Sequence, residues 1–248
     1  SESRIDESVE RIINAKNELG LYDSKSKATW ENVAKQIGST NHRRTASEIA
    51  HRSITLVKDS GTIPLRAESI DSLTHIVMST DDDVRSILKR FIRDIRATHI
   101  HLNEIFINEE LTNLGIQDAL ERAEGSDHII ISLLVRIRMD KGISTIDDSH
   151  ATLIHELHKL GVPVTVISFG SPYLPSYDYI DTYLCAYGYG SVSQVAAADA
   201  IWGRSRISGK LPIKLSEGIQ KKHGIDRART KTGFVLNDIS IDMTSAWD

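Results

Sequence analysis

Apolar positions at the start of the chain follow the spacing of helices. Apolar side chains recur on one stripe that ends before Gly20, which predicts an amphipathic helix over residues 5–19. A shorter and weaker helical pattern covers residues 29–37. The box from Thr45 to Glu48 predicts the start of a third helix, because its hydroxyl and carboxylate groups can satisfy exposed backbone N–H groups.

From residue 54 onward, short apolar runs alternate with helical patterns. The runs over 128–135 and 162–169 are continuously apolar, as expected for strands buried on both faces of a parallel sheet. Residues 84–97 follow the i, i+3, i+4, i+7 spacing of a helix without a gap. Further strands are predicted at 54–58, 74–79, 99–102 (or 104–107 in a competing register) and 180–186, and further helices at 110–123, 147–160 and 192–202. The alternation predicts βαβ units and an α/β fold, a three-layer sandwich with a mostly parallel sheet of five or six strands.

The composition is that of an ordinary globular protein. Of the 248 residues, 40% are hydrophobic and 26% charged, and the formal net charge is -4. This charge argues against nucleic acid as an obligatory partner, because nucleic-acid binders usually carry a basic face. No apolar run approaches the roughly 18 residues that a membrane span needs, so no span is expected. The single cysteine, Cys185, excludes an internal disulfide and a multi-cysteine zinc site, and we expect it to be a small buried side chain.

Two short motifs resemble catalytic or metal sites but lack the required spacing. A zinc-protease helix needs two histidines at i and i+4, whereas His155 and His158 are three positions apart, so we expect no metal and a solvent-facing pair. Ser171 follows a strand, but it lacks the two glycines of a hydrolase nucleophile elbow, and Pro172 hinders an immediate helix start. A tight turn is the simpler interpretation. The turn still lies at the C-terminal end of a parallel strand, where such sheets place ligands.

Gly188 and Gly190 stand between a strand and a helix, as the glycines of a dinucleotide fingerprint do. The third glycine position is occupied by Ser193, and no acidic residue follows at the required distance, so no cofactor is expected. The run from Ser191 to Gln194 is interpreted as a capping box for the alanine-rich helix behind it.

Charged side chains gather after the strand over 128–135. Asp147 and Asp148, with Asp140 and His150 nearby, offer an acid/base cluster. The favoured alternative is that Asp147 or Asp148 caps the helix that begins there, assisted by the helix dipole. Arg136 ends a buried strand and is expected to reach a carboxylate or a ligand at the edge of the sheet.

Several segments of the chain follow one another in an order that is typical of one enzyme family. They are residues 4–13, 50–59, 63–65, 169–174, 186–187, 193–198 and 209–213. Together they resemble the region that follows the barrel in glycoside hydrolase family 3, most closely in its bacterial β-N-acetylglucosaminidase (β-hexosaminidase) branch. The resemblance covers roughly residues 4–215.

The resemblance implies a (β/α)8 barrel followed by an α/β sandwich, and hydrolysis of a terminal β-linked N-acetylhexosamine or a related sugar. In that family an aspartate of the barrel is the nucleophile, and the hexosaminidase branch uses a His–Asp pair on a barrel loop as acid/base. Neither element can be matched in this chain, so we expect no catalytic residue in it and no activity from the chain alone. In the β-glucosidase branch the acid/base glutamate comes from a sandwich loop, whereas residues 136–150 here contain no glutamate.

The resemblance also implies how the chain is organised. Residues 1–22 would be the last helix of a barrel that this chain lacks, and residues 23–65 a connecting helical segment with the strand that leads into the sandwich. Residues 66–215 would form the sandwich, and residues 216–248 a C-terminal tail or linker with one strand candidate at 233–236. The implied partners are the N-terminal barrel of the same protein and a carbohydrate substrate, and a periplasmic or extracellular location is slightly favoured.

The candidate site lies on two loops that leave strands expected to be neighbours. Because the carboxyl ends of parallel strands share one edge, Arg136, Asp140, Ser171 and Tyr173 are expected to face the barrel or its sugar. The alternative function is a non-catalytic carbohydrate-binding or protein-interaction module with the same fold, since fold alone does not determine function.

Overall fold

The fold is taken from a computed structural model, which describes residues 1–22, 29–79, 83–98, 101–137, 142 and 144–230. The chain forms two compact units, Ser1–Arg44 and Thr45–Asp248. In the described part of the chain, no helix has both the length and the apolar character needed to cross a membrane. The domain boundaries expected from the sequence stay predictions.

The first unit consists of helices. α1 spans Glu2–Glu18 and α2 spans Trp30–Gln36, which confirms both predicted helices at the start of the chain. The hydroxyl oxygen of Thr29 accepts a hydrogen bond from the N–H of Asn32 at 3.3 Å and so caps α2. The apolar stripe of α1 is exposed to solvent, since Ile5 has 65% and Ile12 56% of its surface accessible.

The third helix, α3, spans Thr40–Ser53 and crosses from the first unit into the second. The predicted capping box is therefore wrong, because Thr45 lies inside the helix and no free N–H group remains there to cap. The Glu48 carboxylate instead accepts a hydrogen bond from Arg52, one turn later, at 3.2 Å. Ala50 is the buried residue of this helix.

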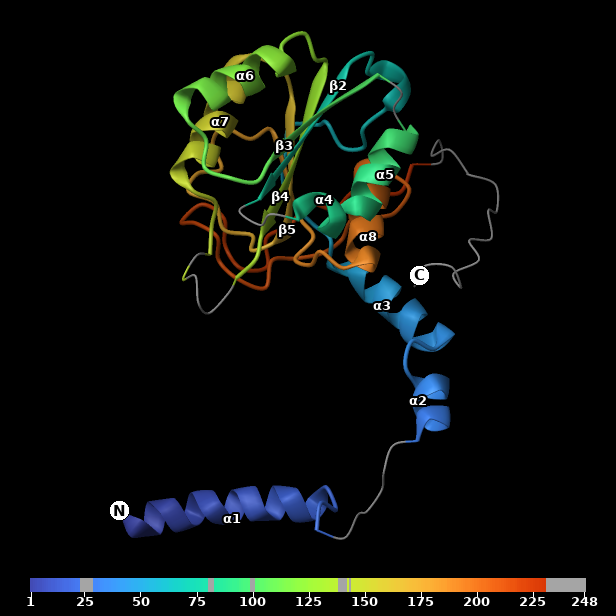
Figure 1. Cartoon of the computed structure of the whole chain (residues 1–248), viewed down its shortest axis with the longest axis vertical. Helices are drawn as coiled ribbons and strands as arrows, with labels where there is room; N and C mark the ends of the chain where they lie inside the picture. The colour runs from blue at the N-terminus through green and yellow to red at the C-terminus, as the bar shows by residue number, and fades with distance from the viewer. Residues whose placement is uncertain (23–28, 80–82, 99–100, 138–141, 143, 231–248) are drawn as a thin grey trace. The chain divides into compact units, whose positions relative to one another are not determined.

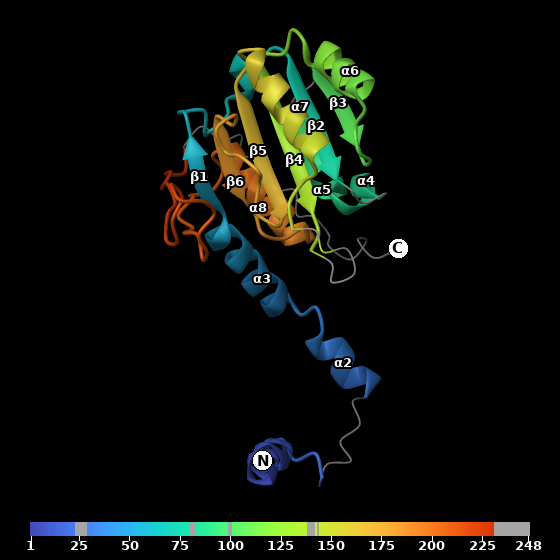
Figure 2. The ribbon, with the colours of Figure 1, turned by 90° about the vertical axis from the view of Figure 1, so that its left-hand side faces the viewer.

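The second unit is built on a six-stranded sheet with the order β1-β6-β5-β4-β2-β3 (Figure 2). The strands are β1 Thr55–Asp59, β2 Leu73–Ser79, β3 Leu102–Ile107, β4 His128–Val135, β5 Val164–Gly170 and β6 Thr182–Cys185. β1 is antiparallel to β6 and every other pair is parallel. Of the two registers considered for β3, the later one is right.

Helices cover both faces of the sheet (Figure 1). α4, α5 and α8 lie on one face, and α6 and α7 on the other. Their bounds are α4 Val84–Ile87, α5 Lys89–Thr98, α6 Asn113–Ala123, α7 Asp148–Lys159 and α8 Ser191–Ile201, with a short 3-10 turn at Ala67–Ser69. The predicted three-layer α/β sandwich with a mostly parallel sheet is confirmed.

Each face of the sheet has its own hydrophobic core, and β4 supplies alternate residues to the two. Ile130 and Leu134 belong to the core under α5 and α8, whereas Ile131 belongs to the core under α6 and α7. Cys185 lies in the second core as a free thiol, as expected, and burial raises its pKa to about 12. The continuous apolar runs in the sequence reflect this burial on two sides.

The helix predicted over 84–97 is interrupted at Leu88, which separates α4 from α5. The side chain of Gln194, from α8, occupies the break. Its oxygen accepts hydrogen bonds from the N–H groups of Arg90 at 3.1 Å and Phe91 at 3.0 Å, and its nitrogen donates to the carbonyl of Ile87 at 2.7 Å. The capping box proposed for residues 191–194 is wrong, because the glutamine caps α5 and not its own helix.

The described part of the expected tail, residues 216–230, is attached to the sandwich. The N–H of Ile225 donates to the carbonyl of Leu56 at 2.8 Å, which adds a bridge to the free side of β1. The N–H of Thr230 donates to the carbonyl of Gly203 at 3.0 Å. Up to residue 230 the segment therefore packs on the sheet, while the strand candidate at 233–236 lies outside the described residues.

Candidate functional site at the carboxyl edge of the sheet

The carboxyl ends of β4 and β5 lie next to each other, with Val135 paired to Gly170. Gly170 has φ +119, and a Cβ at this position would overlap the carbonyl oxygen of Val135. Glycine is therefore required for the chain to leave β5 by a sharp turn. The turn places Ser171 directly over the end of β4, where its N–H donates to the carbonyl of Val135 at 2.9 Å.

The loops after β4 and β5 converge at this edge, as expected. The hydroxyl of Ser171 donates to the carbonyl of Ser144, and the hydroxyl of Thr145 donates to the carbonyl of Tyr173 at 3.0 Å. Ser171 is 3% exposed, so its hydroxyl holds the two loops together and is not presented to solvent as a nucleophile. Tyr173 is 37% exposed and faces outward from the same loop.

Two buried tyrosines fix the loop that carries Ser171 and Tyr173. The hydroxyl groups of Tyr177 and Tyr183 both donate to the carbonyl of Pro172, at 3.0 Å and 2.7 Å. Burial raises the pKa of Tyr177 to about 12 and raises that of Tyr183 well above its ordinary value, so both stay protonated donors. The sequence offered no local signal for this anchor, because Tyr183 lies on β6, eleven residues away from Pro172.

Arg136 extends the site toward β6. Its guanidinium carbon lies 5.3 Å from the centre of the Tyr189 ring, on the loop that follows β6. The contact is of the cation–π type and joins the loops on either side of β5. Three of the four predicted site residues thus come to one edge of the sheet, and the fourth, Asp140, lies outside the described residues.

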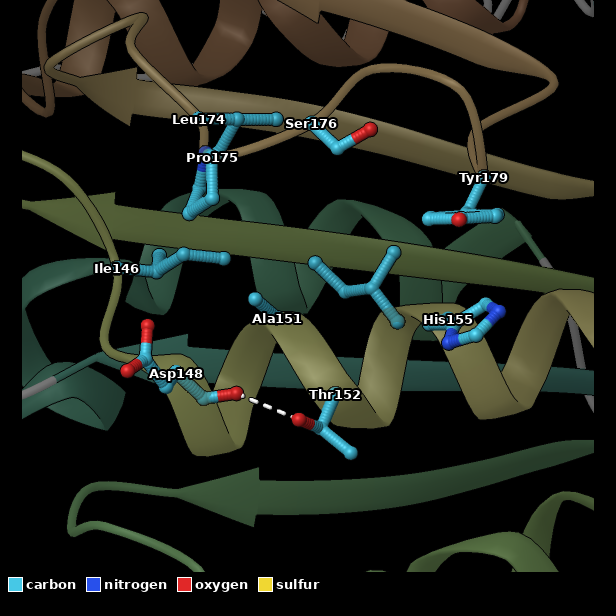
Figure 3. Close-up of a pocket in the computed structure, with 10 residues that line it drawn as sticks. Ile146, Asp148, Ala151, Thr152, His155, Leu174, Pro175, Ser176 and Tyr179 are labelled. Carbon is cyan, nitrogen blue, oxygen red and sulfur yellow. Dashed lines mark hydrogen bonds between the residues drawn. The ribbon is translucent and has the colours of Figure 1, made fainter.

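A groove runs beside this edge, between α7 and the segment after β5 (Figure 3). We call it the α7 groove. Its volume is about 310 Å³, its floor is apolar and its two ends are polar, with Asp148 at one end and His155 at the other. The His155 ring packs against the ring of Tyr179, with the ring centres 4.0 Å apart. In the described chain, no group of three or more acidic, histidine or cysteine side chains could hold a metal ion.

A second groove, the α3 groove, lies where β6 ends and β1 begins. Its volume is about 710 Å³, and the last turns of α3, the loop after β6 and the segment 209–212 line it. Tyr187 has a positive φ of 59 and donates its hydroxyl to Thr55 at 2.9 Å. Lys210 and Arg52 give the groove two cationic side chains. No chemical motif in the sequence singled out these residues, although all four belong to the segments 50–59, 186–187 and 209–213 that carry the family resemblance.

Asp147 caps α7, as the simpler interpretation expected. Its carboxylate accepts hydrogen bonds from the N–H of His150 at 2.9 Å and from the hydroxyl of Ser149 at 2.6 Å. Burial alone would raise the pKa of Asp147, but these hydrogen bonds outweigh it and the pKa is lowered. A carboxylate held in its ionised form is a poor proton donor, so Asp147 serves the helix and not acid catalysis.

Comparison with known proteins gives β-glycosidases. A β-xylosidase of Formosa agariphila is 24% identical over 87% of this chain and 34% of its own length, and a lysosomal β-glucosidase of Dictyostelium discoideum is 25% identical over 86% of this chain and 30% of its own. A β-glucosidase from Listeria innocua shares the fold, with a TM-score of 0.66 at 20% identity over 88% of this chain and 33% of that one.

No protein-family model matches the chain. The chain spans about a third of the length of the curated relatives that it matches. Both curated relatives are glycosidases by name, which supports the resemblance of this chain to the C-terminal region of family 3 glycoside hydrolases. The comparisons do not support its hexosaminidase branch over the others.

Proposed function

We propose that this chain is the C-terminal α/β sandwich domain of a family 3 glycoside hydrolase that cleaves terminal β-glycosidic bonds. The observation that carries the proposal is the match of 87% of the chain to only 34% of a β-xylosidase. A domain that corresponds to one third of an enzyme leaves room for a separate catalytic domain. The naming of both curated relatives as glycosidases favours this function over a non-catalytic binding module.

The division of labour follows from the chemistry. Retaining hydrolysis needs two carboxyl groups about 5–5.5 Å apart across the anomeric carbon, or a similarly placed acid/base group. At the described part of the carboxyl edge, Asp147 is committed to capping α7, and the resemblance assigns the nucleophile to a barrel. We therefore propose that the sandwich braces the barrel and lines one rim of the sugar pocket with Arg136 and Tyr173.

Two observations bear on the finer substrate class, and they point to different sugars. The names of the curated relatives favour β-xylosides and β-glucosides as substrates. Residues 136–150 contain no glutamate that could serve as the acid/base group of the β-glucosidase branch. This second observation supports the β-N-acetylhexosaminidase branch, in which both reacting groups belong to the barrel, and we keep that branch as the finer proposal.

The decisive experiment compares the 248-residue chain with the complete protein that contains the barrel in cis. Both are assayed with 4-nitrophenyl β-xyloside, β-glucoside and β-N-acetylglucosaminide. The complete protein is expected to hydrolyse one of the three, and the chain alone none above background. Turnover by the chain alone that is lost in Asp148→Asn would overturn the assignment of catalysis to the barrel. Failure of the complete protein on all three substrates would overturn the proposed function.

The role of the carboxyl edge is tested in the complete enzyme. Tyr173→Ala is expected to raise KM about 2- to 12-fold if the ring packs against the sugar, since aromatic contacts contribute about 0.5–1.5 kcal/mol. The matched control is Tyr179→Ala, a similarly exposed tyrosine in the α7 groove, which should leave KM unchanged. Unchanged kinetics in both variants would leave the loop with a structural role only.

A further inference from the structure

His51, in the last turn of α3, has a hydrogen-bond acceptor at each of its two ring nitrogens. Nε2 lies 2.9 Å from a carboxylate oxygen of Asp199 on α8, and Nδ1 lies 2.8 Å from the carbonyl oxygen of Ser47. Neither oxygen has a proton to give in its ionised or carbonyl form, so each nitrogen must donate. A neutral imidazole has one donor and one acceptor and can satisfy only one of the two contacts. The Ser47 hydroxyl also lies 3.5 Å from Nδ1 and could donate to a neutral ring, but the carbonyl contact is much shorter, so the geometry favours the doubly protonated ring.

We infer that His51 is held as an imidazolium and acts as a proton-operated latch that fastens the end of α3 to α8. The inference does not depend on the proposed enzymatic function. Loss of the proton leaves a lone pair facing an oxygen atom, which breaks one of the two hydrogen bonds and removes the ion pair. The helix end is then expected to detach from α8.

The latch matters because little else in α3 is buried. Ala50 is its buried residue, and Ile49 beside it is 63% exposed. One alanine contributes little apolar burial, so the His51–Asp199 contact is a large part of what holds this helix end. Ser47, His51 and Asp199 all belong to the second compact unit, so the latch acts within the sandwich and its own part of α3.

The surrounding charges favour the imidazolium. Arg204, which follows α8, lies 3.7 Å from the other oxygen of Asp199, but its guanidinium is already bound by both oxygens of Asp94 on α5 at 3.0 Å. On α3 itself, Glu48 and Arg52 pair with each other. Asp199 is thus left as the counter-ion of His51.

The sign of the pH dependence follows from the direction of the pKa shift. The hydrogen bond from His51 to Asp199 raises the pKa of the histidine, and it outweighs burial, which acts in the opposite direction. A group whose pKa is higher in the folded state than in the unfolded state adds stability at low pH. The latch is therefore complete below the ordinary value of 6.5 and opens as the pH rises through the folded-state pKa.

The charge state is tested by NMR correlation of the ring nitrogens with their protons in the 15N-labelled 248-residue chain, between pH 5.5 and 9. The His51 signals, assigned by their loss in His51→Gln, are expected to show two protonated nitrogens at pH 7. Asp199→Asn should lower the titration midpoint of His51. The control Asp148→Asn removes the same charge from α7, on the opposite face of the sheet, and should leave that midpoint unchanged. A neutral His51 ring at pH 6.5 would overturn the inference.

Opening of the latch is tested by amide hydrogen exchange of residues 45–53, corrected for the intrinsic effect of pH. Protection of these amides is expected to fall through the His51 midpoint, while that of α5 stays constant. In His51→Gln the protection should be low at every pH, with no transition. Constant protection across the titration of His51 would show that its proton does not control the helix, and would overturn the latch.

Discussion

The guanidinium of Arg227 donates two hydrogen bonds to one carboxylate oxygen of Asp59, at 3.1 Å and 2.6 Å, across 168 positions of sequence. The other oxygen of Asp59 accepts from the N–H groups of Gly61 and Thr62 and from the hydroxyl of Thr182 at 3.1 Å. Burial would raise the pKa of Asp59, but these hydrogen bonds lower it. The ion pair ties the last described segment of the chain to the end of β1.

Removing Arg227 is expected to destabilise the sandwich strongly. Arg227→Met removes the counter-ion of the buried Asp59 side chain. Because Arg227 is 33% exposed and the N–H groups of Gly61 and Thr62 still bind the carboxylate, a loss of about 1.5–3 kcal/mol is expected. Urea unfolding of both proteins measures the change. Arg229→Met, at an exposed position two residues later, is the control and should alter stability by less than about 0.5 kcal/mol. Equal stabilities for the two variants would show that the segment is not fastened by this pair.

Gln194 supports a helix other than its own. Gln194→Ala removes the acceptor of two N–H groups at the start of α5 and the donor to the carbonyl of Ile87. Buried groups that lose their partners cost about 1–3 kcal/mol, so we expect a loss of that order in thermal or urea unfolding. The control Gln117→Ala, at an exposed position of α6, should be close to neutral. If Gln194→Ala leaves the free energy of unfolding unchanged, water must replace the hydrogen bonds of the Gln194 amide at no cost in stability.

The sequence predicted correctly those elements whose structure is determined by residues close to them along the chain. The strand over 128–135 has the same bounds in the structure, because eight consecutive residues are buried between two helical layers. The break at Leu88 could not be predicted, since the local apolar pattern is continuous and the side chain that fills the break comes from α8. The attachment of residues 216–230 was missed for the same reason, because Arg227 finds its partner at Asp59.

The sequence predicted where the candidate site lies, but it did not predict the contacts that hold the site together. Parallel strand order brought the loops after β4 and β5 to one edge, as the sequence pattern indicated. The two tyrosine hydroxyls that hold the carbonyl of Pro172 depend on the register of β5 and β6, which no local pattern reveals. The α3 groove depends in addition on where the segment 209–212 returns to the sheet.

The sandwich is expected to lose stability in mild acid. Burial lowers the pKa of His75 to about 3 and that of His128 to about 4, while each ring donates to or accepts from a buried hydroxyl at 2.9 Å. Because both values lie below the ordinary 6.5, the unfolded chain binds more protons in this range, and stability is fully present above pH 6.5 and falls below it. Each histidine contributes a slope of about 1.4 kcal/mol per pH unit.

Urea unfolding at pH 7, 6, 5 and 4.5 measures this slope. His75→Gln should flatten it by the contribution of one histidine, even though the variant is less stable at pH 7. His155→Gln, at a partly exposed position of α7, serves as the control and should leave the slope unchanged. Stability that does not change between pH 6.5 and 4.5 would contradict the assignment of His75 and His128 as buried neutral rings.

Two adjacent aspartates at the start of α7 are expected to respond differently to substitution. Asp147→Ala removes the side chain that accepts from the N–H of His150, and loss of such a cap costs about 0.5–2 kcal/mol. Asp148→Ala changes an exposed side chain at the rim of the α7 groove and should cost less than about 0.5 kcal/mol. Thermal unfolding at pH 7 distinguishes them. A larger loss for Asp148→Ala would contradict the capping role of Asp147.

Because the thiol of Cys185 is buried, its rate of labelling can report how often the structure around it opens. With a pKa of about 12, only about one thiol in 100,000 is ionised at pH 7, and the folded chain shields even that fraction from reagents. Labelling of the native protein by a thiol reagent must then proceed through molecules that have opened around β6, so its rate measures how often this strand is released. A cysteine introduced at an exposed position would react first and alone, which allows a single probe to be attached without removing the native residue.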